Sequence, residues 1–466
     1  MAKNDRLLYL LPVEWEICPA VQWLKRRVME ADTLERWLDL GQRKQLLPFG
    51  QQFGRWSDGT EMISLALCGG DGGEGIEELD AVLRRARMKP ELPDAESGGD
   101  PQGCQPLRDW LSAAYTEEEG CRTDSSQLLL TGGSAEAMDI ILRWCLNIGG
   151  TVLLETPASP EMLEAVRQQG GQAILIPCDK EGMLLEALAR EIERERPSLI
   201  YVAPRYSNPS GRVWSEHRLE ELLRLAARHA LLVVEDDCAG AIPFRSKSAG
   251  DKAAEERAGD IAEPQTLYRL RQKEAPLYFG AEVVGMGSFQ ATAFPSLPVA
   301  WIRGSERSIQ ALAHIRTAMR KRLKAPALEK AAYEQRLYAL LSAPAFSWPE
   351  HAARLAAEYA ARRAAMLEQL REQPAWHGAS FEEPRGGLFL WLRLPPGLCS
   401  EALLRAALPK GAAFMPGARC YAAGAVAPPD GDAIRLTYAA HSAVRLRRGL
   451  ARIAEAIAEF TARGLG

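Results

Sequence analysis

Short, continuous apolar runs alternate with amphipathic helical stretches over residues 127–302, and this alternation restricts the possible folds more than any other feature of the chain. Val152–Glu155 and Leu231–Val234 are two such runs, and Leu219 and Leu222 mark the inner side of a helix between them. Strands that are apolar on both faces are typical of a mostly parallel sheet covered by helices on both sides. The sequence therefore predicts an α/β domain, whose ligands bind at the carboxyl ends of the strands. The other expected strands are Leu128–Leu130, Ala173–Ile176, Leu199–Ala203, Val283–Met286 and Val299–Ile302.

The rest of the chain divides by pattern into an arm, an insertion and a second domain. Residues 1–58 contain two candidate amphipathic helices, and we expect a helical arm that packs across a dimer. The large domain is expected over 59–325, and its stretch 245–266, which has no apolar period, is typical of a mobile insertion. Residues 326–466 are expected to form a helical connection and a small C-terminal α+β domain. Its last helix is expected to bury Leu446, Leu450, Ile453, Ile457 and Phe460 on one face.

Composition excludes several classes of function. The net charge of −4 and the lack of a long basic run argue against a general binder of polyanions. The nine cysteines show no CxxC spacing, which favours free thiols in a reducing cytoplasm over a disulfide framework. No segment has the pattern of a signal peptide or a membrane span, and the six histidines lack metal-ligand spacing.

Six turn motifs follow one another in the chain and together carry a family resemblance. They are Gly99-Asp100-Pro101-Gln102-Gly103 with Leu107-Arg108, Asn208-Pro209-Ser210-Gly211, Glu235-Asp236-Asp237, Pro384-Arg385-Gly386-Gly387, Pro416-Gly417 and Ile434-Arg435-Leu436. In this order and spacing they resemble the fold-type I aminotransferases of class I/II, which depend on pyridoxal phosphate (PLP). The subgroup they resemble is that of the 2-aminoadipate and kynurenine aminotransferases and the C-terminal half of MocR-type regulators. The resemblance covers about residues 60–462.

The resemblance implies roles for residues that have kept their chemistry. Asp236 takes the place of the carboxylate that pairs with the pyridine nitrogen of PLP and keeps it protonated. Asn208 takes the place of the amide that bonds the phenolic oxygen of the ring, and Arg435 that of the guanidinium that grips the substrate carboxylate. The helix amides at Gly133 and Ser134 take the place of phosphate ligands.

The remaining cofactor positions have changed together. The Schiff-base lysine is replaced by Ala291, the phosphate-binding serine by Gln290 and the phosphate-binding arginine by Pro298. The tyrosine after Asp236 is replaced by Cys238, the stacking aromatic by Ser159 and the tyrosine before the GDP motif by Gly98. Structural accounts exist for single changes, since Ser159 is a good helix cap and Pro298 fits the start of an edge strand. They do not explain why the cofactor contacts changed while the turn glycines and prolines stayed.

These changes favour a pseudo-transaminase that has lost PLP Schiff-base chemistry, with a ligand-binding, regulatory or helper-subunit role. The chain is then a homodimer or pairs with an active relative, PLP is its ancestral cofactor, and a small carboxylate or amine is its candidate ligand. A second hypothesis is an active PLP-dependent aminotransferase with an unusual site, which binds the cofactor noncovalently or uses a displaced lysine. Lys247 and Lys252 lie in the insertion and Lys273 just after it, but nothing in the sequence places them at the strand end. A third is a MocR-type regulator, although no winged helix is traceable around the basic run Lys25-Arg26-Arg27.

Overall fold

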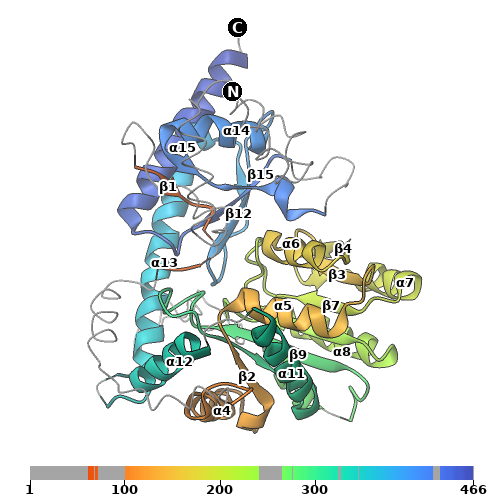
Figure 1. Ribbon diagram of the computed structural model, residues 1–466. Coiled ribbons are helices and arrows are strands. Elements are labelled where there is room, and N and C mark those ends of the chain that lie inside the picture. The colour runs from red at the N-terminus through yellow and green to blue at the C-terminus, as the bar shows by residue number, and fades with distance from the viewer. Residues whose placement is uncertain are drawn as a thin grey trace, which may run out of the picture.

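The structure is a computed structural model that describes residues 61–67, 69–71, 100–240, 265–274, 276–323, 327–344, 346–422 and 431–464. Side chains at 322–330 and 463–464 are not described. The expected arm at 1–58, Gly98, the insertion as far as residue 264 and its two lysines lie outside the described residues. The chain forms two lobes joined along one long helix (Figure 1).

The lower lobe is built on a seven-stranded sheet in the order β2-β10-β9-β8-β7-β3-β4. Its strands are β2 (Leu128–Thr131), β3 (Thr151–Glu155), β4 (Gln172–Ile176), β7 (Leu199–Val202), β8 (Leu232–Asp236), β9 (Glu282–Ser288) and β10 (Ala300–Arg303). All neighbours are parallel except β10, which runs antiparallel to both β2 and β9. The prediction of a mostly parallel sheet is confirmed. A small hairpin pairs β5 (Cys178–Asp179) with β6 (Gly182–Met183).

Helices cover both faces of this sheet because its strands are apolar on both faces. Val152 and Leu154 of β3 pack with α5, α6 and α11, whereas Leu153 between them packs with α7, α8 and α10. This alternation follows from the two-residue period of a strand. The helices are α4 (Gln105–Glu119), α5 (Ser134–Cys145), α6 (Pro160–Gln168), α7 (Leu185–Glu195), α8 (Glu216–Arg228), α10 (Leu267–Lys273) and α11 (Glu306–Leu323).

The upper lobe is the expected α+β unit. Its four-stranded antiparallel sheet has the order β11-β12-β15-β14 and is reached through α12 (Ala327–Leu341) and the long α13 (Trp348–Glu372). An early segment, β1 (Ile63–Ser64), pairs with β13 (Ala412–Ala413) beside this sheet. The remaining elements are β11 (Ser380–Phe381), β12 (Phe389–Arg393), α14 (Ser400–Ala407), β14 (Met415–Pro416), β15 (Ala433–Thr437) and α15 (Ala443–Gly464).

Two expectations for local structure were wrong. Pro298 precedes β10 by two residues, and β10 is paired on both sides, so this proline does not begin an edge strand. In α15 the expected residues Leu446, Leu450, Ile453 and Ile457 are buried, but Phe460 is 37% exposed because the helix runs past the core at its C-terminal end. Within the described residues no helix is both long and apolar enough to cross a membrane.

Candidate functional site

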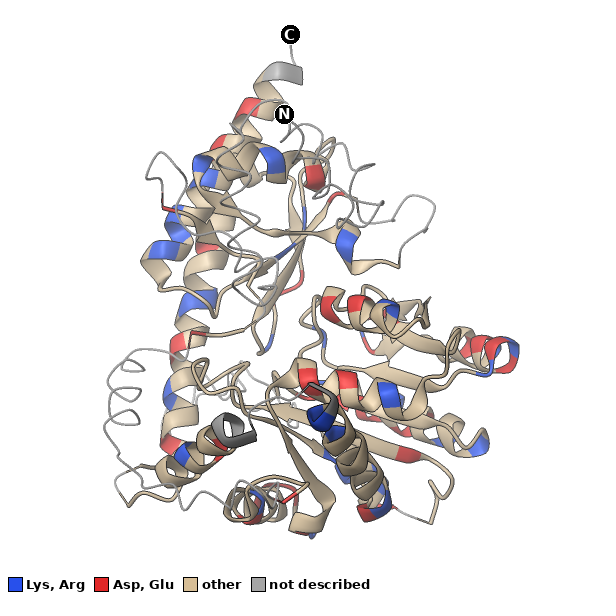
Figure 2. Ribbon diagram, viewed as in Figure 1, with Lys and Arg blue, Asp and Glu red and all other residues tan. Residues whose placement is uncertain are grey.

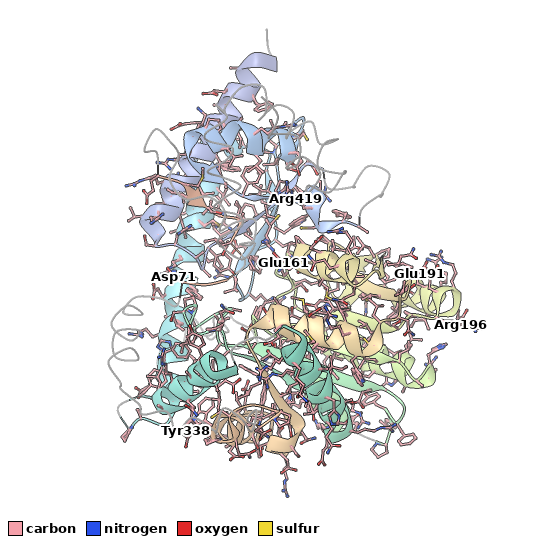
Figure 3. All side chains as sticks on the ribbon, in the orientation of Figure 1. Asp71, Glu161, Glu191, Arg196, Tyr338 and Arg419 are labelled. Carbon is pink, nitrogen blue, oxygen red and sulfur yellow. The ribbon has the colours of Figure 1, made fainter. Side chains whose placement is uncertain are left out.

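The carboxyl ends of five parallel strands bring the expected site residues to one edge of the sheet. Gly133 follows β2, Ser159 follows β3, Asn208 follows β7, Asp236 ends β8, and Ala291 follows β9. Register fixes the last two, because Asp236 lies beside Met286, five residues before Ala291. The upper lobe contributes Arg435 from the middle of β15, and its guanidinium lies 3.6 Å from Glu161 of α6, which Figure 3 labels between the two lobes.

Asp236, the expected partner of a pyridine nitrogen, is bound by groups of the chain itself. The phenolic hydroxyl of Tyr201 on β7 donates to Asp236 Oδ2. The backbone amide of Cys238 donates to Asp236 Oδ1 at 3.0 Å. Burial, and next the charge of Asp236, raises the pKa of the Tyr201 phenol well above its usual value. Tyr201 is therefore the neutral donor of this pair.

Asn208 and Arg435 are brought together although 227 residues separate them. Arg435 Nη1 donates to Asn208 Oδ1 at 2.6 Å, and Arg435 Nη2 donates to the carbonyl of Ala66 at 3.0 Å. The guanidinium is fully buried, and its Cζ lies 4.6 Å from the centre of the Phe389 ring. Arg435 thus joins the small-domain sheet to the turn after β7.

Glu161 supplies a carboxylate to this pair. Its Oε1 lies 3.6 Å from Arg435 Nη2, and its Oε2 accepts from Asn208 Nδ2 at 3.2 Å and from Ser159 Oγ at 2.8 Å. Glu161 lies in the first turn of α6, where the helix dipole favours an anion. The place that the resemblance gives to a substrate carboxylate therefore adjoins a carboxylate of the chain.

The turn after β9 holds Ala291 by its backbone. Ala291 N–H donates to Ser288 Oγ at 3.1 Å, and the Ala291 carbonyl accepts from Gly70 N–H at 2.9 Å. A Cβ on Gly70 would lie 2.2 Å from the hydroxyl oxygen of Tyr359, so glycine is required for the early segment to pass this close. Ala291 offers a methyl group and no nucleophile at the strand end.

The amino end of α5, where phosphate binding was expected, carries an acidic side chain. The Glu136 carboxylate accepts from the backbone amide of Gly132, one residue before Gly133. A Cβ on Gly133 would lie 2.8 Å from Gln290 Oε1, so the Gln290 side chain rests against the helix start. Ser134 is the first residue of α5. The amide of Gly132, next to the expected phosphate-binding residues, is thus bound to a carboxylate of the chain.

Other predicted residues fall as follows. Ser159 caps α6 by accepting from the Met162 amide at 3.3 Å, as expected. Burial and the nearby Asp236 raise the pKa of the Cys238 thiol well above its usual value. Lys273 is exposed at the end of α10, beside the start of β9 and thus at the opposite end of that strand from Ala291. No metal-binding group of His, Cys, Asp and Glu occurs among the described residues.

Two further carboxyl groups surround Asp236 and are held by buried partners. Burial raises the pKa of Glu235 to about 7, and the Asp237 charge adds to this, although the Glu235 carboxylate caps the start of α10. Burial also raises the pKa of Asp237, and the ion pair with Arg205 opposes this effect. The Glu235 carboxylate is buried against the start of α10, and the Asp237 carboxylate is largely covered by its pair with Arg205.

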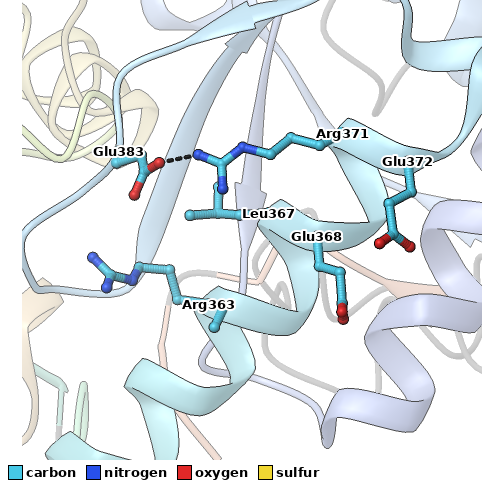
Figure 4. A pocket seen from close by; sticks show the side chains of 7 residues that line it. Arg363, Leu367, Glu368, Arg371, Glu372 and Glu383 are labelled. Atoms are coloured by element: carbon cyan, nitrogen blue, oxygen red, sulfur yellow. Dashed lines mark hydrogen bonds and ion pairs between the residues drawn. The ribbon is translucent and has the colours of Figure 1, made fainter.

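Two cavities lie near α-helices of the two lobes. One of about 430 Å³ lies between α5 and α6, and its lining includes Ala135, Asp139 and Glu161. Another of about 300 Å³ lies along α13, where Arg371 pairs with Glu383 across it (Figure 4). The first borders the candidate site through Glu161, and the second is separate from it.

Sequence reasoning missed three residues of this site: Tyr201, Glu161 and Glu136. Tyr201 is hidden within an apolar strand, and the other two stand in first turns of helices, where acidic residues are common. A polar tyrosine among the aliphatic residues of β7 was an available signal. The acidic pair offered none, because its partners lie elsewhere in the chain.

The α/β fold with these turns at its carboxyl edge is that of the PLP-transferases of fold type I. The sequence profile of aminotransferase class I and II matches residues 71–453. The chain belongs to this family, whose enzymes are PLP-dependent.

The relatives include enzymes and regulators. A 2-aminoadipate transaminase of Thermus thermophilus is 29% identical over 388 residues, which cover 82% of this chain and 86% of the relative. The solved structure of an α-aminoadipate aminotransferase from Thermus thermophilus, complexed with N-(5'-phosphopyridoxyl)-L-leucine, matches with a TM-score of 0.70 and 28% identity. It covers 85% of this chain and 93% of that one. An uncharacterized HTH-type transcriptional regulator of Bacillus subtilis is 26% identical over 371 residues, or 78% of this chain and 68% of the relative.

Proposed function

We propose that this chain is an aminotransferase-family protein that has lost covalent PLP chemistry and acts as a ligand-binding, regulatory or helper subunit. The observation that carries the proposal is the alanine at position 291, in the turn after β9. Transamination needs an amine there that binds the cofactor and moves the substrate proton, and a methyl group does neither.

The surrounding residues support the same proposal, because they do not fit a phosphorylated cofactor. A phosphate dianion would meet the Glu136 carboxylate at the Gly132 amide, while Gln290 and Pro298 offer no positive charge. Two lost charge-assisted hydrogen bonds cost about 1.5–3 kcal/mol each, and every ~1.4 kcal/mol is tenfold in affinity. The four lysines whose side chains the structure describes offer no substitute: Lys180, Lys273 and Lys321 are exposed, and Lys410 pairs with Glu459 at 2.5 Å.

The test is to incubate the purified full chain with PLP. We expect no visible absorbance band of a lysine-linked cofactor and no adduct after borohydride reduction and mass spectrometry. A trapped adduct on any lysine would reject the proposal and would name the displaced residue.

An active aminotransferase with an unusual site is the second candidate, and the 2-aminoadipate transaminase relative favours it. A trapped adduct together with amino-group transfer from an amino acid to a 2-oxo acid would establish it. Asp236 and Asn208 would then serve the ring as the resemblance implies.

A regulator is the third candidate, favoured by the match to an HTH-type transcriptional regulator. Against it, Lys and Arg are interspersed with Asp and Glu along the described helices that Figure 2 shows, whereas DNA binding uses a basic patch or stripe. A salt-sensitive gel shift with genomic fragments would establish this function. The test requires the whole chain, since the segment with Lys25-Arg26-Arg27 lies outside the described residues.

Assembly and location complete the proposal. We propose a dimer with a second copy or with an active relative, because the family builds its active sites across a dimer interface. All seven described cysteines are free thiols, which supports a reducing, cytoplasmic location. Size-exclusion chromatography with light scattering measures the oligomeric state of the purified protein. Repeating it after incubation with an extract of the cells that produce the protein tests for a second, different subunit.

A further inference from the structure

We infer that Glu161 occupies, as an internal ligand, a carboxylate-binding site formed by Arg435 and Asn208, so that small carboxylates bind only when Glu161 is displaced. This inference deepens the proposed function, on which it rests, by naming the ligand class of the site and the residue that excludes it. It concerns one residue that the family resemblance does not assign.

The Arg435 guanidinium needs an anionic partner. It is fully buried, and a buried cation is costly unless it is paired and hydrogen-bonded. Asn208 and the Ala66 carbonyl satisfy part of its donor fork but carry no charge. The Glu161 carboxylate at 3.6 Å supplies the charge.

Glu161 is positioned as a ligand rather than as a loose surface side chain. One oxygen takes two donors, from Ser159 and Asn208, while the other faces Arg435. Asn208 contacts both members of the ion pair, through its amide oxygen to Arg435 and its amide nitrogen to Glu161. This is the arrangement of a bound carboxylate with a cation on one side and an amide donor on the other.

The cavity beside Glu161 gives this side chain somewhere to go. The side chain is 29% exposed and lines the cavity of about 430 Å³ between α5 and α6. A ligand carboxylate that took over Arg435 and Asn208 would displace Glu161 into that space. The contact also ties the lobes together, since Glu161 on α6 and Asn208 after β7 belong to the lower lobe, whereas β15 with Arg435 belongs to the upper lobe (Figure 1).

The experiment uses Glu161→Ala, which removes a CH₂–COO⁻ group that acetate can replace. Thermal unfolding is measured in sodium acetate, in sodium chloride of equal ionic strength and in added acetamide. Acetate should raise the Tm of the variant by about 2 °C at tenfold excess over Kd. The Kd of the variant for acetate should be at least about tenfold lower than that of the wild type. In the variant acetate forms a new charge-assisted pair with Arg435, whereas in the wild type it must first displace Glu161. Acetamide should not reproduce the effect.

Matched variants decide between outcomes. Glu164→Ala removes another carboxylate from the same helix. In the described contacts Glu164 binds only Arg167 and Gln168 on the surface, so this variant should gain no acetate response. Glu161→Ala with Arg435→Met should lose the response. If Glu161→Ala does not fold, Glu161→Gln keeps the side-chain size, and acetate should stabilise it more than it stabilises the wild type.

Two results would overturn the inference: equal acetate binding by wild type and Glu161→Ala, or no acetate response of folded Glu161→Ala or Glu161→Gln. Neither result depends on PLP. A borohydride-trapped cofactor in the wild type would instead reject the proposed function while leaving the acetate measurements to be judged by themselves.

Discussion

Restoring the lysine alone should not restore cofactor binding. Ala291→Lys places an amine after β9, but the Gly132 amide beside the expected phosphate-binding residues stays bound to the Glu136 carboxylate, and no serine or arginine returns. We expect the single variant to show no saturable absorbance change with PLP. The triple variant with Gln290→Ser and Pro298→Arg should bind, and adding Glu136→Ala should tighten binding further.

The expected magnitude follows from the groups that change. A serine hydroxyl and an arginine each add a charge-assisted hydrogen bond of about 1.5–3 kcal/mol, together about 3–6 kcal/mol. At ~1.4 kcal/mol for each factor of ten, Kd should fall by roughly two to four orders of magnitude from single to triple variant. Removing Glu136 frees the Gly132 amide and removes a like charge, which should add about another tenfold.

The assay is a PLP titration followed by absorbance, with borohydride trapping and peptide mapping to locate the modified lysine. The control is Ala291→Lys with Lys273→Ala, since Lys273 is exposed at the other end of β9 and should not matter. Equal affinity of the single and triple variants would refute the reasoning, because Gln290 and Pro298 would then not stand at phosphate-binding positions.

Three further predictions concern stability. Glu119→Gln breaks a buried ion pair in which Arg303 Nη1 and Nη2 each donate to one carboxylate oxygen of Glu119 at 2.8 Å. It should cost about 3–5 kcal/mol in urea unfolding, whereas exposed Glu117→Gln should cost little. Burial raises the pKa of Glu235 from 4.5 to about 7, so the folded protein binds this proton more tightly than the unfolded chain. The contribution of Glu235 to folding stability should therefore be greatest below pH 4.5 and be lost as pH rises through 7. Glu235→Gln should flatten that part of the Tm profile. Burial, and next the charge of Arg354, lowers the pKa of His351 from 6.5 to about 4, so its contribution should be lost as pH falls from 6.5 through 4. His351→Leu should remove this acid sensitivity.

The fold could be predicted from the sequence because its signals are local. The apolar runs at 152–155 and 283–286 lie within β3 and β9, and the helical connection expected from residue 326 contains α12 and α13. Turn chemistry placed Ser159 as the cap of α6. The lone antiparallel strand β10 was not predicted, since nothing in an apolar run records the direction of its neighbours.

The site was only half predictable, because its partners are set by tertiary contacts. The motifs pointed to Asp236 and Asn208 at the carboxyl edge of the large sheet and to Arg435, which contacts Asn208 from β15. The groups that bind them do not belong to any motif. Glu161 reaches Arg435 from a different lobe, and Tyr201 reaches Asp236 across 35 residues through the pairing of β7 with β8.

These internal partners share a physical logic. A site that had lost only its lysine would leave a carboxylate, a guanidinium and a backbone amide without the cofactor and substrate groups that they bind in the family. Buried polar groups without partners are destabilising. In this chain the tyrosine hydroxyl meets Asp236, the Glu161 carboxylate meets Arg435, and the Glu136 carboxylate meets the Gly132 amide. The three contacts come from different elements and satisfy groups of different charge. Under the proposed function they explain how the fold keeps its charged residues buried without a cofactor, and why adding back one amine is not enough to recover one.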